Sequence, residues 1–258
     1  MQRVTIAPHQ LQHQQISLTD AQLHYLQRVL RLKVGDRFIA LDGEGHGWVA
    51  ILNQEMATAT VIKPWQTNLE LPLGLHLIIA MPKTGMDDIV RQTTELGVTA
   101  IQPVVSDRTL LKPSPNKVER WRRIAQEAME QSERQCVPVI HDPVSLVEGL
   151  QQAPPDQRWI CVARQLADHP APLLLSALLE QSLEPPTPEG NGGEWQGSGT
   201  MTLAIGPEGG WTRAEVVGAI AQNYRAVSLG PRILRTVTAP LTAITLMAAV
   251  IEHQQSRL

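Results

Sequence analysis

The sequence is poor in cysteine, in aromatic residues and in net charge, and each shortage excludes a class of protein. The two cysteines, Cys136 and Cys161, have aliphatic neighbours and lack the paired spacing of a zinc or thioredoxin motif, so we expect free thiols and no metal site. Only 3% of the residues are aromatic, which argues against an extended platform for stacking bases. The net charge of -3 excludes a protein coated in basic residues for nucleic-acid binding.

Long apolar runs are also missing. No stretch approaches the roughly 20 apolar residues that are needed to cross a bilayer. The N-terminal stretch "MQRVTIAPHQLQHQQ" lacks the basic and apolar regions of a signal peptide. We therefore expect a soluble, cytoplasmic protein with reduced thiols, and 258 residues are enough for a main domain with a smaller companion.

Positive charge is concentrated in two places. The segment 108–123 contains six basic residues and one acidic residue, and a second cluster consists of Arg225, Arg232 and Arg235. These clusters could bind RNA, or they could be ordinary solvated loop and helix surfaces.

Residues 1–68 predict a small β-rich domain. A short helix with Leu23, Leu26 and Leu30 on one face precedes three short strands, "RFIAL", "WVAIL" and "ATATVIKP". Strands of this length joined by tight turns favour a small barrel. The polar segment after Pro64 is interpreted as a linker.

From about residue 73 the pattern changes to strands that alternate with helices, which indicates an α/β domain with a parallel sheet over residues 73–258. The run "LHLIIAMP" is almost wholly apolar, as expected of a strand covered on both faces. A Pro- and Gly-rich insertion near residues 183–200 is expected to form a mobile surface loop.

The stretch "IGPEGGWT" follows an apolar strand and precedes a helix, where ligands gather in parallel α/β sheets. It has neither a Walker lysine nor a GxGxxG spacing, and the carboxylate of Glu208 would repel a triphosphate. Its glycines suit a ligand with hydroxyls, amines or a positive centre, although they could serve turn geometry alone. Thr212 and Glu215 form a capping box for the next helix.

A second loop, "LGPRILRT", follows the next strand, so Arg232 and Arg235 are expected on the same side of the sheet as the first loop. They could equally be two surface arginines. The helix that begins near Ala239 is apolar on most faces, with Leu241, Ile244, Leu246, Met247, Val250 and Ile251. We therefore expect this helix to be buried and to pack on a second copy of the chain in a homodimer.

Both loops, with the earlier blocks "VLRLKVGD", "MPKTGMDDIVRQTTELGVTAIQPVVSDRT" and "RWRRIAQEAMEQSERQCVPVI", strongly resemble the RsmE family of SPOUT methyltransferases. The resemblance covers nearly the whole chain. It implies a PUA-like, RNA-binding β-barrel over residues 1–68 and a SPOUT trefoil-knot α/β domain over residues 73–258. It also implies S-adenosylmethionine as cofactor and methylation of N3 of one uridine, usually numbered 1498, in the 16S ribosomal RNA of the small subunit.

In this family three loops hold the cofactor, and here they resemble the loop after "RWICVAR" and the two loops above. The resemblance places cofactor contacts at Ile205, Gly206, Glu208, Gly209, Gly210, Leu229, Gly230, Ile233 and Leu234. Arg232 and Arg235 are the candidates for stabilising the uridinate oxygens or holding a phosphate. We expect Gly209→Val to abolish cofactor binding in a folded dimer, because a side chain there would occupy ligand space.

One residue departs from the family pattern. Many relatives have a glutamate where this chain has Val237, so no general base is assigned. The candidates for RNA contact are basic residues, Arg3, Arg28, Arg31, Lys33, Lys83, Arg108, Lys112 and Arg134, although Arg28 and Arg31 could equally be ordinary helix charges. Two other functions stay open: a SPOUT enzyme that methylates a ribose 2′-hydroxyl of transfer or ribosomal RNA, and an RNA-binding assembly factor without catalysis.

Overall fold

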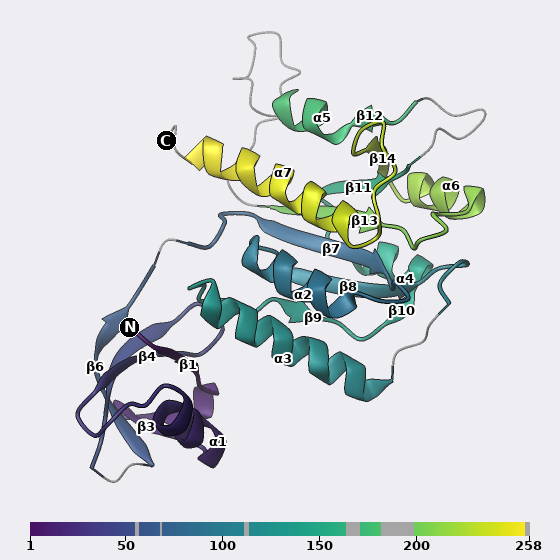
Figure 1. The fold of residues 1–258 in the computed structure, drawn as a ribbon. Helices are drawn as coiled ribbons and strands as arrows, with labels where there is room; N and C mark the ends of the chain where they lie inside the picture. Colours follow the sequence, from purple (N-terminus) through teal and green to yellow (C-terminus); the bar gives the residue numbers. More distant parts are fainter. Residues whose placement is uncertain (55–56, 68, 111–113, 164–170, 182–198, 256–258) are drawn as a thin grey trace. The chain divides into compact units, whose positions relative to one another are not determined.

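The structure, a computed structural model, describes residues 1–54, 57–67, 69–110, 114–163, 171–181 and 199–255 (Figure 1). Its contacts divide the chain into two compact units. The first contains Met1–Glu70 and Gln126–Val137, and the second contains Leu71–Ala125 and Pro138–Leu258. The Pro- and Gly-rich insertion predicted near residues 183–200 lies almost entirely outside the described residues.

The first unit contains a six-stranded sheet in the order β1-β4-β5-β6-β3-β2. Neighbouring strands are antiparallel except for β1 and β4, which are parallel. The strands are β1 (Arg3–Thr5), β2 (Leu11–Gln12), β3 (Gln15–Ser17), β4 (Arg37–Leu41), β5 (Gly47–Leu52) and β6 (Thr58–Trp65). The three strands predicted here correspond to β4, β5 and β6 and are confirmed, but β6 continues through Pro64, where the sequence predicts the start of a linker.

A short helical segment packs on this sheet. Helix α1 (Asp20–His24) begins with a capping box of Thr19 and Gln22 and continues as a π-helical turn, Tyr25–Val29, and a separate 3-10 turn covers Pro8–Gln10. Leu26 is fully buried in the apolar core of this unit, whereas Leu23 and Leu30 are half-buried. The predicted apolar face is therefore present, but only its central residue reaches the middle of the core.

A buried ion pair holds the segment 126–137 in the first unit. Arg134 is 3% exposed, and its Nε and Nη2 donate to Glu70 Oε2 at 3.1 and 2.7 Å. The other carboxylate oxygen accepts the backbone N–H groups of Gln135 and Cys136 at 2.8 and 3.0 Å. Burial alone would raise the pKa of Glu70, but the hydrogen bonds and charge of Arg134 outweigh burial and lower that pKa. The buried guanidinium of Arg134 is therefore compensated by the partly buried carboxylate of Glu70.

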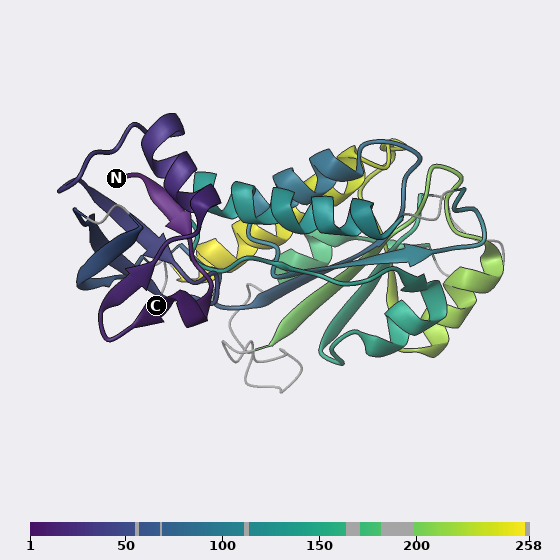
Figure 2. The same cartoon turned by 90° about the horizontal axis from the view of Figure 1, so that it is seen from below.

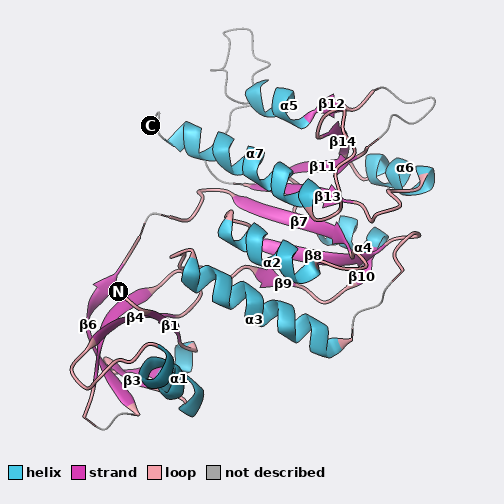
Figure 3. Cartoon of the chain, in the orientation of Figure 1, coloured by secondary structure: helices cyan, strands magenta, loops and turns pink. Residues whose placement is uncertain are grey.

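The second unit contains a parallel sheet with crossover helices, which confirms the α/β alternation (Figure 3). The strand order is β10-β8-β7-β13-β11-β14-β12, with β9 also paired to β8, and the paired strands are parallel. The strands are β7 (Gly74–Ala80), β8 (Ala100–Val105), β9 (Val139–Ile140), β10 (Val144–Ser145), β11 (Gln157–Cys161), β12 (Leu173–Leu174), β13 (Thr200–Ile205) and β14 (Arg225–Ser228).

The strand order determines which loops meet. β7 lies between β8 and β13, and β11 lies between β13 and β14, so segments that are distant in the sequence become neighbours. Parallel strands end at the same edge of a sheet. The loops after β7, β8, β11, β13 and β14 therefore gather at one edge, where ligands bind in α/β proteins of this kind.

Helices cover both faces of the parallel sheet. They are α2 (Met86–Glu95), α4 (Leu146–Gln152), α5 (Leu175–Gln181), α6 (Arg213–Ala221) and α7 (Thr238–Gln255), while α3 (Pro115–Gln131) runs from the second unit into the first. α7 packs against α2 and α5 on one face, and α4 packs against α6 on the other (Figure 2). No helix in the described part of the chain is long and apolar enough to span a membrane.

Helix α7 is buried on one side only. Ile244 and Met247 are fully buried against the second unit, whereas Leu241, Leu246 and Val250 are partly exposed. The prediction of a buried helix is therefore correct for one face. Leu246 and Val250, one helical turn apart, are partly exposed at one margin of that face, and Leu241 is partly exposed at the other margin.

Candidate functional site

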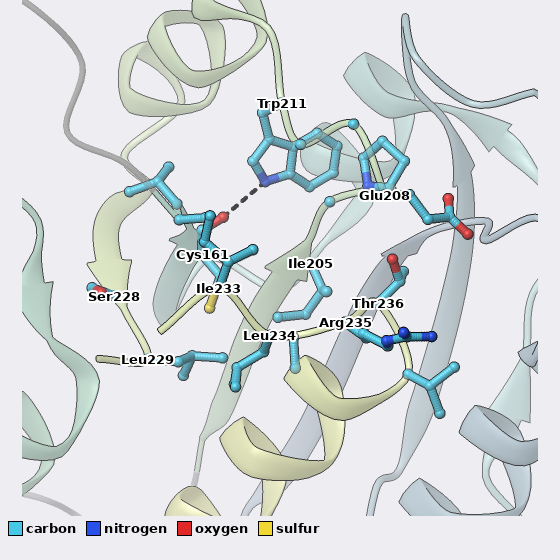
Figure 4. A pocket seen from close by; sticks show the side chains of 18 of the residues that line it. Cys161, Ile205, Glu208, Trp211, Ser228, Leu229, Ile233, Leu234, Arg235 and Thr236 are labelled. Atoms are coloured by element: carbon cyan, nitrogen blue, oxygen red, sulfur yellow. Dashed lines mark hydrogen bonds between the residues drawn. The ribbon is translucent and has the colours of Figure 1, made fainter. Parts of the chain in front are cut away.

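A pocket of about 750 Å³ lies at the carboxyl edge of the parallel sheet (Figure 4). It is lined by segments that follow five strands, β7, β8, β11, β13 and β14. The structure brings together here all the residues that the resemblance places near a cofactor, together with Arg232 and Arg235: Ile205, Gly206, Glu208, Gly209, Gly210, Leu229, Gly230, Ile233 and Leu234. The third expected loop contributes Val162 and Ala163, and residues 164–170 lie outside the described part. Ligand contact by these residues stays a prediction.

Trp211 connects two of the loops and forms one wall of the pocket. Its indole Nε1 donates to the backbone carbonyl of Cys161 at 3.0 Å, which ties the end of β11 to the segment after β13 (Figure 4). A Cβ on Gly206 would lie 3.2 Å from the indole ring, so a glycine at 206 allows the ring to pack directly on the backbone. Sequence reasoning misses Trp211, although an aromatic residue directly after two glycines is a signal that could have identified it.

Glu208 links the glycine loop to the loop after β7. Its Oε1 accepts the backbone N–H of Lys83 at 2.9 Å. The side chain is exposed, and Oε2 has no hydrogen bond to another described residue. One oxygen therefore maintains the loop structure, and the other is available to a hydroxyl or ammonium group.

The predicted capping box at the start of α6 is confirmed and has a third member. The Thr212 hydroxyl accepts the backbone N–H of Glu215 at 3.3 Å, and Glu215 Oε2 accepts the backbone N–H of Thr212 at 2.6 Å. Asp107, from the segment after β8, donates its backbone N–H to Glu215 Oε1 at 2.8 Å and accepts from the Thr212 hydroxyl at 3.0 Å. These bonds hold the end of the glycine loop against the segment after β8.

Arg232 and Arg235 carry the positive charge of the pocket rim. Both side chains are exposed, and within the described ranges neither guanidinium is paired with a carboxylate. The carbonyl oxygen of Arg235 accepts the backbone N–H groups of Thr238 and Ala239 at 2.9 Å, so this residue is fixed at the first turn of α7. The arrangement can attract an anionic group to the mouth of the pocket.

Val237 lies between the pocket and the start of α2. A Cβ on Gly85, the residue before α2, would lie 2.6 Å from Val237 Cγ2, so the valine packs directly on the glycine backbone. Gly85 has a φ of 91°, a left-handed conformation that favours glycine. The apolar side chain at 237 thus contributes packing, and it offers no group that could accept a proton.

The two cysteines are free, as predicted. Cys161 lines the pocket, and burial raises the pKa of its thiol far above the ordinary value. In the first unit, burial and then the charge of Glu70 raise the pKa of the Cys136 thiol. Both groups are therefore protonated at neutral pH and are poor nucleophiles. Across the described ranges, no group of side chains is arranged to hold a metal ion.

The residues predicted to contact RNA have different environments. Five are exposed, namely Arg28, Arg31 and Lys33 in the first unit and Lys83 and Arg108 in the second. The Arg3 side chain is 13% exposed and pairs with Glu133 at 2.9 Å. Arg134 is buried against Glu70, so its prediction is corrected to a structural role, because a buried guanidinium that already binds a carboxylate cannot reach a phosphate. Lys112 lies outside the described residues.

Sequence comparison relates both ends of the chain to known proteins. Residues 69–248 match the RNA methyltransferase domain family, and residues 18–58 match the RNA methyltransferase PUA domain family. The chain is 45% identical over 254 residues to the ribosomal RNA small subunit methyltransferase E of Synechocystis sp.. The aligned region covers 97% of this chain and 78% of that protein. It is 30% identical to the Bacillus subtilis protein of the same name, over 89% of this chain and 88% of that protein.

Two solved structures are similar along nearly the whole chain. The ribosomal RNA small subunit methyltransferase E of Neisseria gonorrhoeae, bound to S-adenosyl methionine, has a TM-score of 0.79 and 31% identity over 97% of this chain and 98% of that chain. A putative methyltransferase of Legionella pneumophila, in complex with S-adenosyl methionine, has a TM-score of 0.75 and 25% identity over 96% of this chain and 97% of that chain. These similarities confirm the predicted fold, a SPOUT α/β domain with an N-terminal PUA-like domain. Together, the two domains define a class of RNA methyltransferases. The chain belongs to the ribosomal RNA small subunit methyltransferase E family.

Proposed function

We propose that this protein transfers a methyl group from S-adenosylmethionine to N3 of one uridine in the 16S RNA of the small ribosomal subunit. The family resemblance implies the uridine usually numbered 1498. One observation carries the proposal: in a chain of this family, the residues expected around a methyl donor all line a single pocket.

The pocket suits S-adenosylmethionine in size and in chemistry. Its volume of about 750 Å³ lies within the range of about 300 to 1,000 Å³ that is usual for ligand sites. A Cβ on Gly210 or Gly230 would meet no atom within 4 Å, so both glycines border open space. We propose that these glycines approach the ligand closely, that Glu208 faces one of its positive groups, and that the remaining contacts are Ile205, Gly206, Gly209, Leu229, Ile233 and Leu234.

The bound cofactor would supply an electrophilic methyl group. The protein must then orient the uracil ring so that N3 faces this carbon, and must stabilise the negative charge that remains when N3 loses its proton. Arg232 and Arg235 are proposed to bind the uridinate oxygens or a neighbouring phosphate, because both are exposed at the pocket rim. Val237 supplies no carboxylate for the N3 proton, and we assign no residue as the base.

We propose that residues 1–68 contribute RNA binding and that residues 73–258 carry the methyl-transfer site. In the first unit, Arg28, Arg31 and Lys33 are exposed and suited to phosphate contact. In the second unit the exposed candidates are Lys83, whose backbone N–H bonds Glu208, and Arg108, which lines the pocket. Arg3 is proposed as a weaker RNA contact, because its charge is already paired with Glu133.

We further propose that the protein acts as a homodimer in the cytoplasm. The partly exposed pair Leu246 and Val250 on α7 would be covered by the second copy of the chain. Partly exposed apolar side chains one helical turn apart are suited to a two-fold interface, because the same residues can meet their own copies.

A cell lacking the gene provides the test in vivo. Nucleosides from its small-subunit RNA should lose N3-methyluridine when analysed by mass spectrometry, and the gene supplied on a plasmid should restore it. Loss of a ribose methylation with N3-methyluridine unchanged would refute the proposal in favour of 2′-hydroxyl methylation. Unchanged nucleosides would favour an assembly factor without catalysis.

A further inference from the structure

Arg108 lies along the glycine loop. Its Nη1 donates to the carbonyl oxygen of Gly209 at 2.6 Å. A Cβ built on Gly209 would lie 3.1 Å from Arg108 Cδ, 3.5 Å from its Cβ and 3.8 Å from its Cγ. The aliphatic stem of the arginine therefore covers the side of residue 209 where a side chain would project.

The peptide group between Gly209 and Gly210 is held at both ends. Its carbonyl oxygen accepts from Arg108, and its N–H donates to the carbonyl oxygen of Pro207 at 2.8 Å. A peptide plane with both polar groups bonded cannot rotate without breaking one of those bonds. Arg108 thus contributes one of the two bonds that orient this part of the pocket wall.

Arg108 is itself held in place by its own segment. The backbone N–H of Ser106 donates to the Thr109 hydroxyl at 3.0 Å, and the backbone N–H of Thr109 donates to the Ser106 carbonyl at 3.0 Å. The adjacent Asp107 is bonded to both members of the α6 capping box. The segment 106–109 is therefore a rigid support from which Arg108 reaches the loop.

The charge of Arg108 strengthens this contact. In the part of the chain that the structure describes, no carboxylate pairs with its guanidinium, and the hydrogen bond to Gly209 is charge-assisted.

We infer that Arg108 is a positioning residue for cofactor binding: it fixes the Gly209–Gly210 peptide, and residue 209 is glycine because the arginine stem occupies the adjacent space. The inference rests on the proposed function, in which this pocket binds S-adenosylmethionine. It assigns Arg108 to the glycine loop in place of the direct RNA contact predicted from the sequence. It also implies that a side chain at residue 209 would collide with Arg108 first, and not with the ligand.

Two substitutions separate the charged hydrogen-bond donor of Arg108 from its aliphatic stem. Arg108→Met retains an aliphatic stem but removes the donor, and should weaken S-adenosylmethionine binding about tenfold in calorimetry. It should raise KM for the cofactor and leave KM for the small subunit near the wild-type value. Arg108→Lys keeps a charged donor and should recover part of the affinity. Arg91→Met, which removes an exposed arginine of α2 that does not line the pocket, is the matched control and should change neither constant.

The outcomes distinguish this inference from the proposed function. Wild-type protein that binds no S-adenosylmethionine would refute the proposed function and the inference with it. Normal cofactor affinity in Arg108→Met, with or without a higher KM for the subunit, would refute the inference alone.

A double-mutant cycle tests the claim about Gly209. Gly209→Ala should weaken cofactor binding severalfold in the wild-type background, because the new Cβ would press on Arg108 Cδ. In an Arg108→Ala background the same change should have a much smaller effect, since the stem is gone. An equal effect of Gly209→Ala in both backgrounds would show that the ligand, and not Arg108, requires glycine at 209.

Discussion

At the scale of single residues, the buried pair His76 and Thr202 is a conspicuous feature away from the pocket. The two residues are direct neighbours on β7 and β13, and both are buried. Both ring nitrogens of His76 and the Thr202 hydroxyl lack a hydrogen-bond partner among the described residues. Burial, and then the nearby His141, lower the pKa of His76 to about 4, so the fold contains the neutral imidazole.

This histidine predicts acid sensitivity of the fold. The pKa of His76 is lower in the folded chain than in the unfolded chain. The neutral imidazole therefore makes its full contribution to the free energy of unfolding above pH 6.5, and this contribution is lost as the pH falls toward 4. Between pH 7 and pH 5 the loss should be roughly 2 kcal/mol. Urea unfolding at both pH values measures it, and His76→Gln should remove most of the difference. An identical pH dependence in wild type and variant would contradict this account.

At the scale of elements, the sequence predicts which loops form the pocket but not how they are held. The loops after β13 and β14 could be placed on one side because strands that alternate with helices form parallel sheets, whose carboxyl ends share an edge. The bonds between Arg108 and Gly209, and between Glu208 and Lys83, join residues more than 100 positions apart in the chain. The periodicity of apolar residues indicates which face of a helix or strand is buried and where the element ends. It does not indicate which distant segment the element contacts. The same limit applies to Arg134, whose basic side chain predicts RNA contact while its partner Glu70 lies 64 positions away in the chain.

The start of α2 should be sensitive to added volume. Gly85→Ala would place a Cβ 2.6 Å from Val237 Cγ2 in a left-handed backbone conformation, and should destabilise the protein by about 1 to 3 kcal/mol. Adding Val237→Ala should recover the part of the stability loss that the clash causes, but not the part that backbone strain causes. Chemical denaturation of both variants provides the measurement. No recovery in the double variant would show that the two residues are not in contact.

The buried ion pair of the first unit should matter far more than an exposed one. Arg134→Met leaves Glu70 without its partner and should lower the free energy of unfolding by about 3 kcal/mol. Arg91→Met breaks the exposed pair with Asp88 and should cost less than about 1 kcal/mol. Guanidinium unfolding of the two variants makes the comparison. Equal losses would contradict the structural role assigned to Arg134.

At the scale of the whole molecule, the division into two units can be predicted from the sequence pattern, but the exact residues of each unit cannot. The change from short strands and turns to alternating strands and helices near residue 70 is visible in the sequence. The return of residues 126–137 to the first unit is not, because residues 126–131 are the last turns of α3 and continue its helical pattern across the boundary between the units without a break. A trefoil knot is likewise a property of chain path, which local patterns do not encode.

The proposed dimer predicts a specific response on α7. Leu246→Asp places a charge at a partly exposed apolar position of α7, beside Val250, and should convert a dimer into a monomer in light scattering. Val217→Asp, at a 41% exposed apolar position of α6 on the opposite face of the sheet, is the matched control and should leave a dimer. A wild-type protein that is monomeric at micromolar concentration would contradict the proposal.

The most direct measurement is methyl transfer by the purified protein. It is incubated with S-adenosylmethionine and small ribosomal subunits or naked 16S RNA from cells that lack the gene, and the product nucleosides are identified by mass spectrometry. We predict N3-methyluridine at a single position, and a large loss of product when Arg235 is replaced by alanine. A methylated ribose, or no methyl transfer to either substrate, would contradict the account.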